Sequence, residues 1–183
     1  NKIAVVTGAA NGQGASEAKL LASEGATVIV ADIRKELGLS VVSEIDQLGG
    51  YAEYAKLDVR DEENWQKLVS NIINKHKRID ILINNAAIRP EKPFLETTDA
   101  DWHQVLDVDL NAAFYGCRAV LPGMVSNRWG RIINLTGMNA IHGYSGRAPV
   151  SVAKHGIWGL TKALAKEFGP SGITVNAISP GPI

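Results

Sequence analysis

The chain has 183 residues, 45% of them hydrophobic, which is enough for one domain with a substantial core. Its 19 basic residues balance its 19 acidic residues, so a nucleic-acid partner, which requires a basic surface, is not expected. The single cysteine, Cys117, excludes an internal disulfide and favours a reducing, cytoplasmic location. No apolar run approaches the roughly 18 residues that a membrane-spanning helix needs, so no membrane association is expected.

The N-terminal part of the chain predicts a strand, a tight turn, a helix and a second strand. The β-branched apolar run Ile3–Val6 predicts a buried strand, and the glycine-rich turn Thr7–Gly14 follows it. An alanine- and leucine-rich helical pattern continues as far as Gly25. The second strand, Thr27–Ala31, ends in Asp32, so a carboxylate follows directly after buried backbone.

This order of elements is typical of a dinucleotide-binding unit. Gly8 and Gly12 allow the backbone to turn sharply and to approach a pyrophosphate, and Gly14 allows close packing of the helix. The helix N-terminus offers free N–H groups to phosphates, and Asp32 can accept hydrogen bonds from an adenosine ribose. The alternative is a tight turn without a ligand. The turn residues expected in the site are Gly8, Asn11, Gly12, Gln13 and Gly14.

The rest of the chain continues the alternation of helix and strand. Regular alternation predicts a doubly wound parallel sheet of about six strands, an α/β fold with three αβα layers. Its ligands bind at the carboxyl ends of the strands. The expected elements are helix Lys35–Leu48, strand Tyr51–Leu57, helix Asp61–Lys77 capped by Asp61, strand Ile79–Ile83, helix Asp99–Asn127 with a break near Val108, strand Arg131–Leu135, helix Pro149–Phe168 and strand Ile173–Ile178.

Five motifs together resemble the short-chain dehydrogenase/reductase family over nearly the whole chain. They are Thr7–Gly14, Asp58-Val59, Asn84–Ala87, Ser151–Gly156 and Asn176–Pro182. The resemblance implies a single NAD(P)-binding Rossmann fold over residues 1–183. It places Asp58 on the adenine amino group and Val59 beside the adenine ring. It also assigns the turn Asn85, Ala86 and Ala87 to the adenosine side, and Pro180 and Gly181 to the nicotinamide.

The resemblance also implies the reaction and the cofactor. Family members transfer a hydride between nicotinamide and a small-molecule alcohol or carbonyl compound. Asp32, followed by the apolar Ile33, indicates NAD, because a carboxylate would repel the extra phosphate of NADP. Arg34 lies nearby and leaves NADP as the less favoured alternative.

The catalytic positions depart from the family pattern. The family uses a tyrosine, a lysine four residues later, a serine thirteen residues before the tyrosine and an asparagine on the long helix. This chain keeps the lysine as Lys154 but carries Val150, Gly137 and Asp109 at the other three positions. We expect turnover to be greatly reduced, with Asp109 paired to Lys154, which also bonds the nicotinamide ribose in the family. Tyr144 is the best candidate for a substitute proton donor.

Three interpretations follow from these departures. The chain is an NAD-dependent oxidoreductase with an altered active site, a non-catalytic NAD-binding member of the family, or an engineered inactive variant. The resemblance further implies a homodimer or homotetramer formed by the long helix and the helix after Pro149. Trp102, Phe114 and Trp158 would supply apolar contacts there or pack within the subunit. It also implies that the family's C-terminal lid and last strand would begin where this sequence stops.

Overall fold

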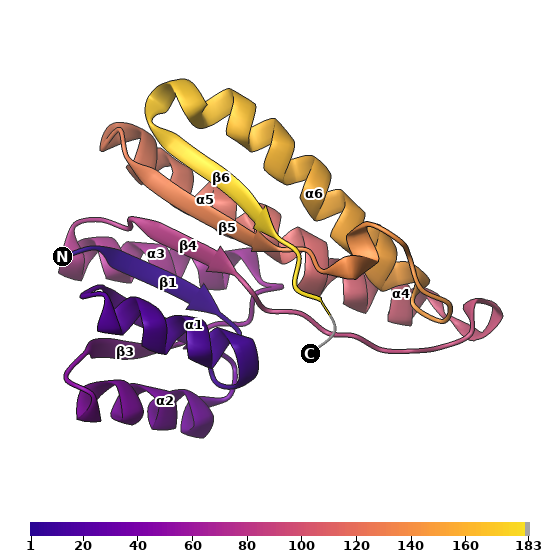
Figure 1. Cartoon of the computed structure of the whole chain (residues 1–183), viewed down its shortest axis with the longest axis horizontal. Coiled ribbons are helices and arrows are strands. Elements are labelled where there is room, and N and C mark those ends of the chain that lie inside the picture. The colour runs from indigo at the N-terminus through magenta and orange to yellow at the C-terminus, as the bar shows by residue number, and fades with distance from the viewer. Residues whose placement is uncertain (182–183) are drawn as a thin grey trace.

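Six parallel strands form one sheet, in the order β3-β2-β1-β4-β5-β6, in the computed structural model, which describes residues 1–181. The chain winds outward from β1 to β3, then returns past β1 to build β4, β5 and β6 (Figure 1). The predicted doubly wound sheet is therefore confirmed, with its change of direction between β1 and β4. The strands are β1 Ile3–Thr7, β2 Thr27–Asp32, β3 Tyr51–Lys56, β4 Ile81–Asn84, β5 Gly130–Leu135 and β6 Ile173–Ile178.

Helices cover both faces of the sheet. The first two helices pack on one face, and the helices that follow β3, β4 and β5 pack on the other, as right-handed crossovers require (Figure 1). The helices are α1 Gly12–Ser23, α2 Lys35–Gln47, α3 Glu62–His76, α4 Asp99–Leu106, α5 Ala112–Ser126 and α6 Ala148–Phe168. Their ends lie close to the predicted ones. Asp61 caps α3 as predicted, because its side chain accepts hydrogen bonds from Glu63 N and Asn64 N. Within residues 1–181, no helix is long and apolar enough to cross a bilayer.

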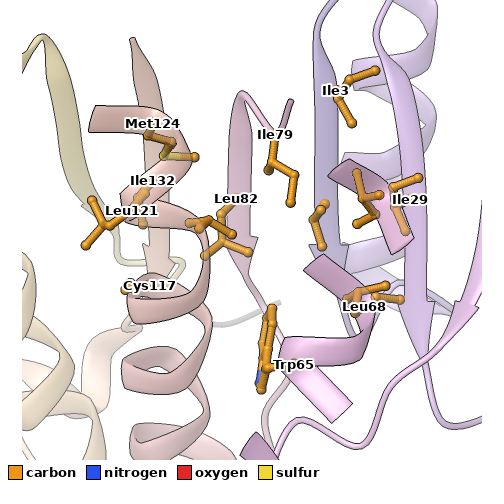
Figure 2. Close-up of a cluster of buried hydrophobic side chains, with 14 of the residues drawn as sticks. Ile3, Ile29, Trp65, Leu68, Ile79, Leu82, Cys117, Leu121, Met124 and Ile132 are labelled. Carbon is orange, nitrogen blue, oxygen red and sulfur yellow. The ribbon is translucent and has the colours of Figure 1, made fainter. Parts of the chain in front are cut away.

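The core follows from the alternation of side chains along each strand. In β1, Ile3 and Val5 enter the cluster under α3 and α5, whereas Ala4 and Val6 enter the cluster under α1 and α2. Figure 2 shows the first of these clusters, in which side chains of α5 meet residues of β4 and β5. Trp65 of α3 is its largest fully buried side chain, and its indole Nε1 donates to the carbonyl of Val59 at 3.0 Å.

The long helix predicted over 99–127 does not break. Instead, a π-helical segment, Asp107–Asn111, joins α4 to α5 at the position where a break was predicted. A capping box of Thr98 and Asp101 begins α4. The wider turn of a π-helix changes the direction of its side chains, and Asp109 in its centre is buried.

A buried polar network fixes α6 against the sheet. Asn84 of β4 donates from Nδ2 to Asn134 Oδ1 of β5 at 2.8 Å, and Asn134 donates from Nδ2 to Thr161 Oγ1 of α6 at 2.9 Å. Thr161 in turn donates to the carbonyl of Ile157 at 2.8 Å. These buried groups are satisfied only when β4, β5 and α6 are in register, so the network orients the helix that carries Lys154.

Candidate functional site

The carboxyl ends of the strands surround a cleft of about 660 Å³. A smaller cavity of about 170 Å³ adjoins it beside β5 and α6. The cleft brings together the predicted residues Gly8, Asn11, Gly12, Gln13, Gly14, Asp32, Ile33, Asp58, Val59, Asn85, Ala86 and Ala87. The predicted residues Gly137, Tyr144, Lys154, Pro180 and Gly181 line the cavity. The scattered positions of the sequence therefore line two neighbouring spaces that share Arg89.

The glycine turn is closely packed on one side and open on the other. A Cβ atom on Gly8, whose φ is +63°, would lie 2.9 Å from the Cα atom of Ala86. A Cβ on Gly14 would lie 2.5 Å from both the Gly8 carbonyl oxygen and Asn85 Nδ2. Gly12, with φ of +54°, has nothing within 4 Å of its Cβ position. The turn thus leaves empty space at Gly12, where backbone N–H groups of α1 begin.

Hydrogen bonds from the turn after β4 hold the glycine turn in place. Thr7 Oγ1 accepts from the backbone N–H groups of Asn85 and Ala86, both at 3.1 Å. The Asn85 side chain donates from Nδ2 to the Thr7 carbonyl at 2.9 Å. An apolar residue in place of Asn85 would leave the Thr7 carbonyl without this donor.

Asp32 is buried and bound by Arg34. Arg34 donates to Oδ1 from its backbone N at 2.9 Å and from Nε at 3.0 Å, and its Nη2 lies 3.0 Å from Oδ2. The Ala10 backbone N–H also donates to Oδ2, at 3.1 Å. Burial raises the pKa of Asp32, but the hydrogen bonds from Arg34 and Ala10 outweigh burial and hold this pKa below its usual value. The carboxylate is therefore ionised and already paired.

The same arrangement recurs at the end of β3. Arg60 donates to Asp58 Oδ1 from its backbone N at 3.1 Å and from Nε at 3.0 Å, and its Nη2 lies 2.7 Å from Oδ2. These hydrogen bonds lower the pKa of Asp58. The role of Arg60 was not predicted from the sequence. The signal was present, because Asp-x-Arg occurs after both β2 and β3.

Asp109 and Lys154 form the predicted ion pair. Their Oδ2 and Nζ atoms lie 3.3 Å apart, and both side chains are almost fully buried. Asp109 Oδ1 accepts the backbone N–H of Ile88 at 2.7 Å, and Lys154 Nζ donates to the Leu135 carbonyl at 3.1 Å. Burial raises the pKa of Asp109 and lowers the pKa of Lys154, and the attraction between the two charges only partly opposes this.

Val150 and Gly137, the two other positions at which the sequence predicted a departure from the family pattern, carry no polar side chain. Val150 is fully buried and packs with Val105 and Ala153, so it offers no polar group. Gly137 has φ of +76° and ψ of 173°, a backbone conformation that other residues adopt only with strain. Tyr144 lines the same cavity as Lys154 and Gly137.

Two loops are joined beside this cavity. The loop that follows β4 and the loop that precedes α6 both extend from the carboxyl edge of the sheet (Figure 1). Lys92 N donates to the Gly146 carbonyl at 2.8 Å, and Arg147 Nη2 lies 2.8 Å from Glu91 Oε2. Arg89 lines both the cleft and the cavity. The sequence had suggested it only as one of the residues of a mixed polar and apolar substrate pocket, together with Met138, Asn139 and Tyr144, and these three line the cavity as well. Its place at both openings depends on how the two loops meet, which the sequence could not show.

Comparisons with known proteins agree with this geometry. The model of the short chain dehydrogenase family matches residues 2–183. Cyclopentanol dehydrogenase from Comamonas sp. (strain NCIMB 9872) is 37% identical over 183 residues, which are 100% of this chain and 73% of that protein. The 3-oxoacyl-(acyl-carrier-protein) reductase of Thermotoga maritima is 37% identical over 98% of this chain and 73% of that protein. A crystal structure of a metagenomic short-chain oxidoreductase in complex with NADP is 30% identical, with a TM-score of 0.96 over 100% of this chain and 82% of that chain.

The chain therefore belongs to the short-chain dehydrogenase family of oxidoreductases, which use a nicotinamide cofactor and act on small alcohols or carbonyl compounds.

Proposed function

We propose that this protein is an NAD-preferring oxidoreductase that transfers a hydride between nicotinamide and a small alcohol or carbonyl compound, with altered catalytic positions. The observation that carries the proposal is that the cleft at the glycine turn and the cavity at Lys154 share Arg89 as a lining residue. An extended ligand that occupied both spaces would contact the glycine turn at one end and Lys154 at the other.

The residues present fit a dinucleotide. The open space at Gly12, next to the start of α1, would accommodate a pyrophosphate. At Gly8 and Gly14, protein atoms already occupy the space where a Cβ would lie. Asp32 would bind the adenosine ribose, and Asp58 and Val59, which line the same cleft, would contact the adenine. At the other end, Lys154 would bond the nicotinamide ribose, and Pro180 and Gly181 would flank the nicotinamide. When bound, nicotinamide supplies or accepts the hydride.

The choice between NAD and NADP depends on the pair of Asp32 and Arg34. The buried carboxylate disfavours a phosphate on the ribose, which supports NAD. Arg34 partly cancels this effect, because it neutralises the carboxylate and offers a guanidinium to a phosphate. We therefore expect a preference for NADH that is moderate in wild type and stronger in Arg34→Ala.

The proton for the substrate oxygen must come from a group that replaces the missing tyrosine. Tyr144 shares the cavity with Lys154, so we assign it this role. The absence of a side chain at Gly137 removes one hydrogen-bond donor to the developing oxyanion, which typically costs about 10²–10³ in rate. The proposed enzyme is accordingly slow.

The proposed assembly is a homodimer or homotetramer through α5 and α6. Phe114 of α5 and Trp158 of α6 are each 42% exposed, and Val152 of α6 is 46% exposed. Aromatic residues of this kind are enriched in the cores of interfaces. Light scattering coupled to size exclusion tests the assembly, and a monomer at micromolar concentration would contradict it.

Calorimetric titration with NADH and NADPH tests the cofactor proposal. Wild type is expected to bind NADH more tightly. Arg34→Ala is expected to weaken NADPH binding by about tenfold, which is about 1.4 kcal/mol, and to change NADH binding little. Arg128→Ala, at the amino edge of the sheet and outside the cleft, is the matched control. A folded protein that binds neither nucleotide would refute the proposal.

Steady-state turnover of a panel of alcohols and carbonyl compounds then tests the role of Tyr144. Tyr144→Phe is expected to lower kcat by about 10²-fold or more and to leave the affinity for NADH unchanged. An unchanged kcat would remove Tyr144 from the mechanism. NADH binding without turnover of any compound would support the non-catalytic interpretation instead.

A further inference from the structure

The cavity beside Lys154 is lined by positive charges. Arg89, Arg147 and Lys154 face it, and no carboxylate is among the described residues that line it. Arg147 is paired with Glu91 at 2.8 Å, and Lys154 is paired with Asp109 at 3.3 Å. Two of the three charges are thus balanced by the protein.

Arg89 is the exception. Among residues 1–181 its guanidinium has neither an ion pair nor a side-chain hydrogen bond with another residue. The neighbouring residue is fixed, because the Ile88 N–H is bound by Asp109 Oδ1 at 2.7 Å. The positive charge of Arg89 also contributes to lowering the pKa values of Asp109 and Lys154, so its field reaches the ion pair. The net charge of the cavity is therefore positive, and the unbalanced cation is Arg89.

The dinucleotide does not supply the missing anion. On the proposed function, its phosphates lie at Gly12 and the start of α1, in the part of the cleft next to the glycine turn. The cavity lies at the other end, with Lys154, Pro180 and Gly181, where the uncharged nicotinamide amide and the substrate are expected. An anionic group bound within this cavity would then belong to the substrate. Because Arg89 also lines the cleft, its effect on NADH affinity is measured alongside its effect on the substrate probes.

We propose that Arg89 binds an anionic oxygen group of the substrate, a carboxylate or a phosphate, and thereby selects oxo acids, hydroxy acids or their phosphorylated counterparts. The planar guanidinium matches such groups through paired N–H donors. The inference rests on the proposed function, since it assigns a substrate class to the same site. It makes Arg89 a specificity-determining residue, separate from Lys154.

Titration calorimetry of the full-length protein saturated with NADH tests the proposal. The probes are levulinate, which carries a carboxylate, hydroxyacetone phosphate, which carries a phosphate, and methyl levulinate, which is uncharged. Wild type is expected to bind at least one anionic probe about tenfold or more tightly than the ester, which is about 1.4 kcal/mol. The probe that shows this preference distinguishes a carboxylate from a phosphate.

Variants identify the residue responsible. Arg89→Gln is expected to abolish the preference for the anionic probe and to leave binding of the ester and of NADH within about threefold. Arg89→Lys is expected to retain part of the preference, because it keeps the charge without the planar geometry. Arg128→Gln removes an equal charge at the opposite edge of the sheet and is expected to behave like wild type.

Each remaining outcome decides the question. Equal binding of all three probes to wild type overturns the proposal, as does a preference that survives in Arg89→Gln. An equal loss of NADH affinity in Arg89→Gln assigns the residue to the dinucleotide and also overturns it. If wild type fails to bind NADH, the proposed function fails, and the titrations are repeated without nucleotide. A preference for anions that depends on Arg89 would then support the anion site alone, and its absence would refute both proposals.

Discussion

The buried ion pair between Asp109 and Lys154 allows a quantitative test of how this site is held together. The substitution Asp109→Asn removes the charge of the carboxylate and keeps its shape. The amide oxygen of the new side chain can still accept the N–H of Ile88, as Oδ1 does at 2.7 Å. The variant therefore isolates the loss of the charge that faces Lys154.

The expected loss of stability follows from the geometry. At 3.3 Å and an effective dielectric constant of about 20, the attraction between the two charges is about 5 kcal/mol. Removing the carboxylate also relieves the cost of burying it, so the net loss is smaller. Deprotonation of Lys154 sets an upper limit, because neutralising a lysine of ordinary pKa at about pH 7 costs about 4.6 kcal/mol. We expect Asp109→Asn to lower the free energy of unfolding by about 3 kcal/mol.

The pH dependence has a definite sign. Without Asp109, burial lowers the folded-state pKa of Lys154 further, so the unfolded state binds more protons between that pKa and the ordinary lysine value. The stability of the variant then rises with pH across this window. Its deficit relative to wild type is expected to be smaller at about pH 9.5 than at about pH 7.

Urea unfolding at both pH values measures these effects. Asp107→Asn, in the same π-helical segment but less buried, is the matched control, with an expected loss below about 1 kcal/mol. The double variant Asp109→Asn/Lys154→Met is expected to lose less than the sum of the two single losses. A loss below about 1 kcal/mol for Asp109→Asn, or strictly additive losses, would refute the view that this pair is mutually dependent.

Four further substitutions test packing, backbone geometry and helix capping by urea unfolding. Gly116→Ala in α5 is expected to lower the free energy of unfolding by about 1–3 kcal/mol, because the new Cβ would lie 2.8 Å from the Trp65 ring. Gly123→Ala in the same helix is expected to raise it by about 0.5–1 kcal/mol, because its Cβ would meet nothing within 4 Å. Equal effects of the two substitutions would contradict the packing argument. Gly137→Ser, which restores the family residue, is expected to cost about 1–3 kcal/mol through its φ of +76°, and an unchanged stability would show that this loop adapts freely. Asp61→Ala removes the cap of α3 and is expected to lower the free energy of unfolding by about 1 kcal/mol. An unchanged stability would show that this cap contributes nothing.

Local patterns in the sequence were sufficient to predict the fold. The alternation of apolar strands and amphipathic helices predicted the parallel sheet, because periods of about 2 and 3.6 residues are properties of neighbouring residues. The cap at Asp61 and the glycine turn before α1 were predictable for the same reason. The irregularity near Val108 was located, but the sequence could not show that it is a continuous π-helical segment rather than a break.

The sequence by itself determined which residues meet at the carboxyl edge of the sheet, since the order of the elements places the ends of all parallel strands there. Only the tertiary structure decided how these residues pair. Arg34 forms an ion pair with Asp32, and Arg60 forms one with Asp58. Arg89 lines both the cleft and the cavity and has no ion-pair partner among the described residues. The physical reason is that side-chain pairing depends on distance, burial and competing partners, which are set by segments far apart in the chain.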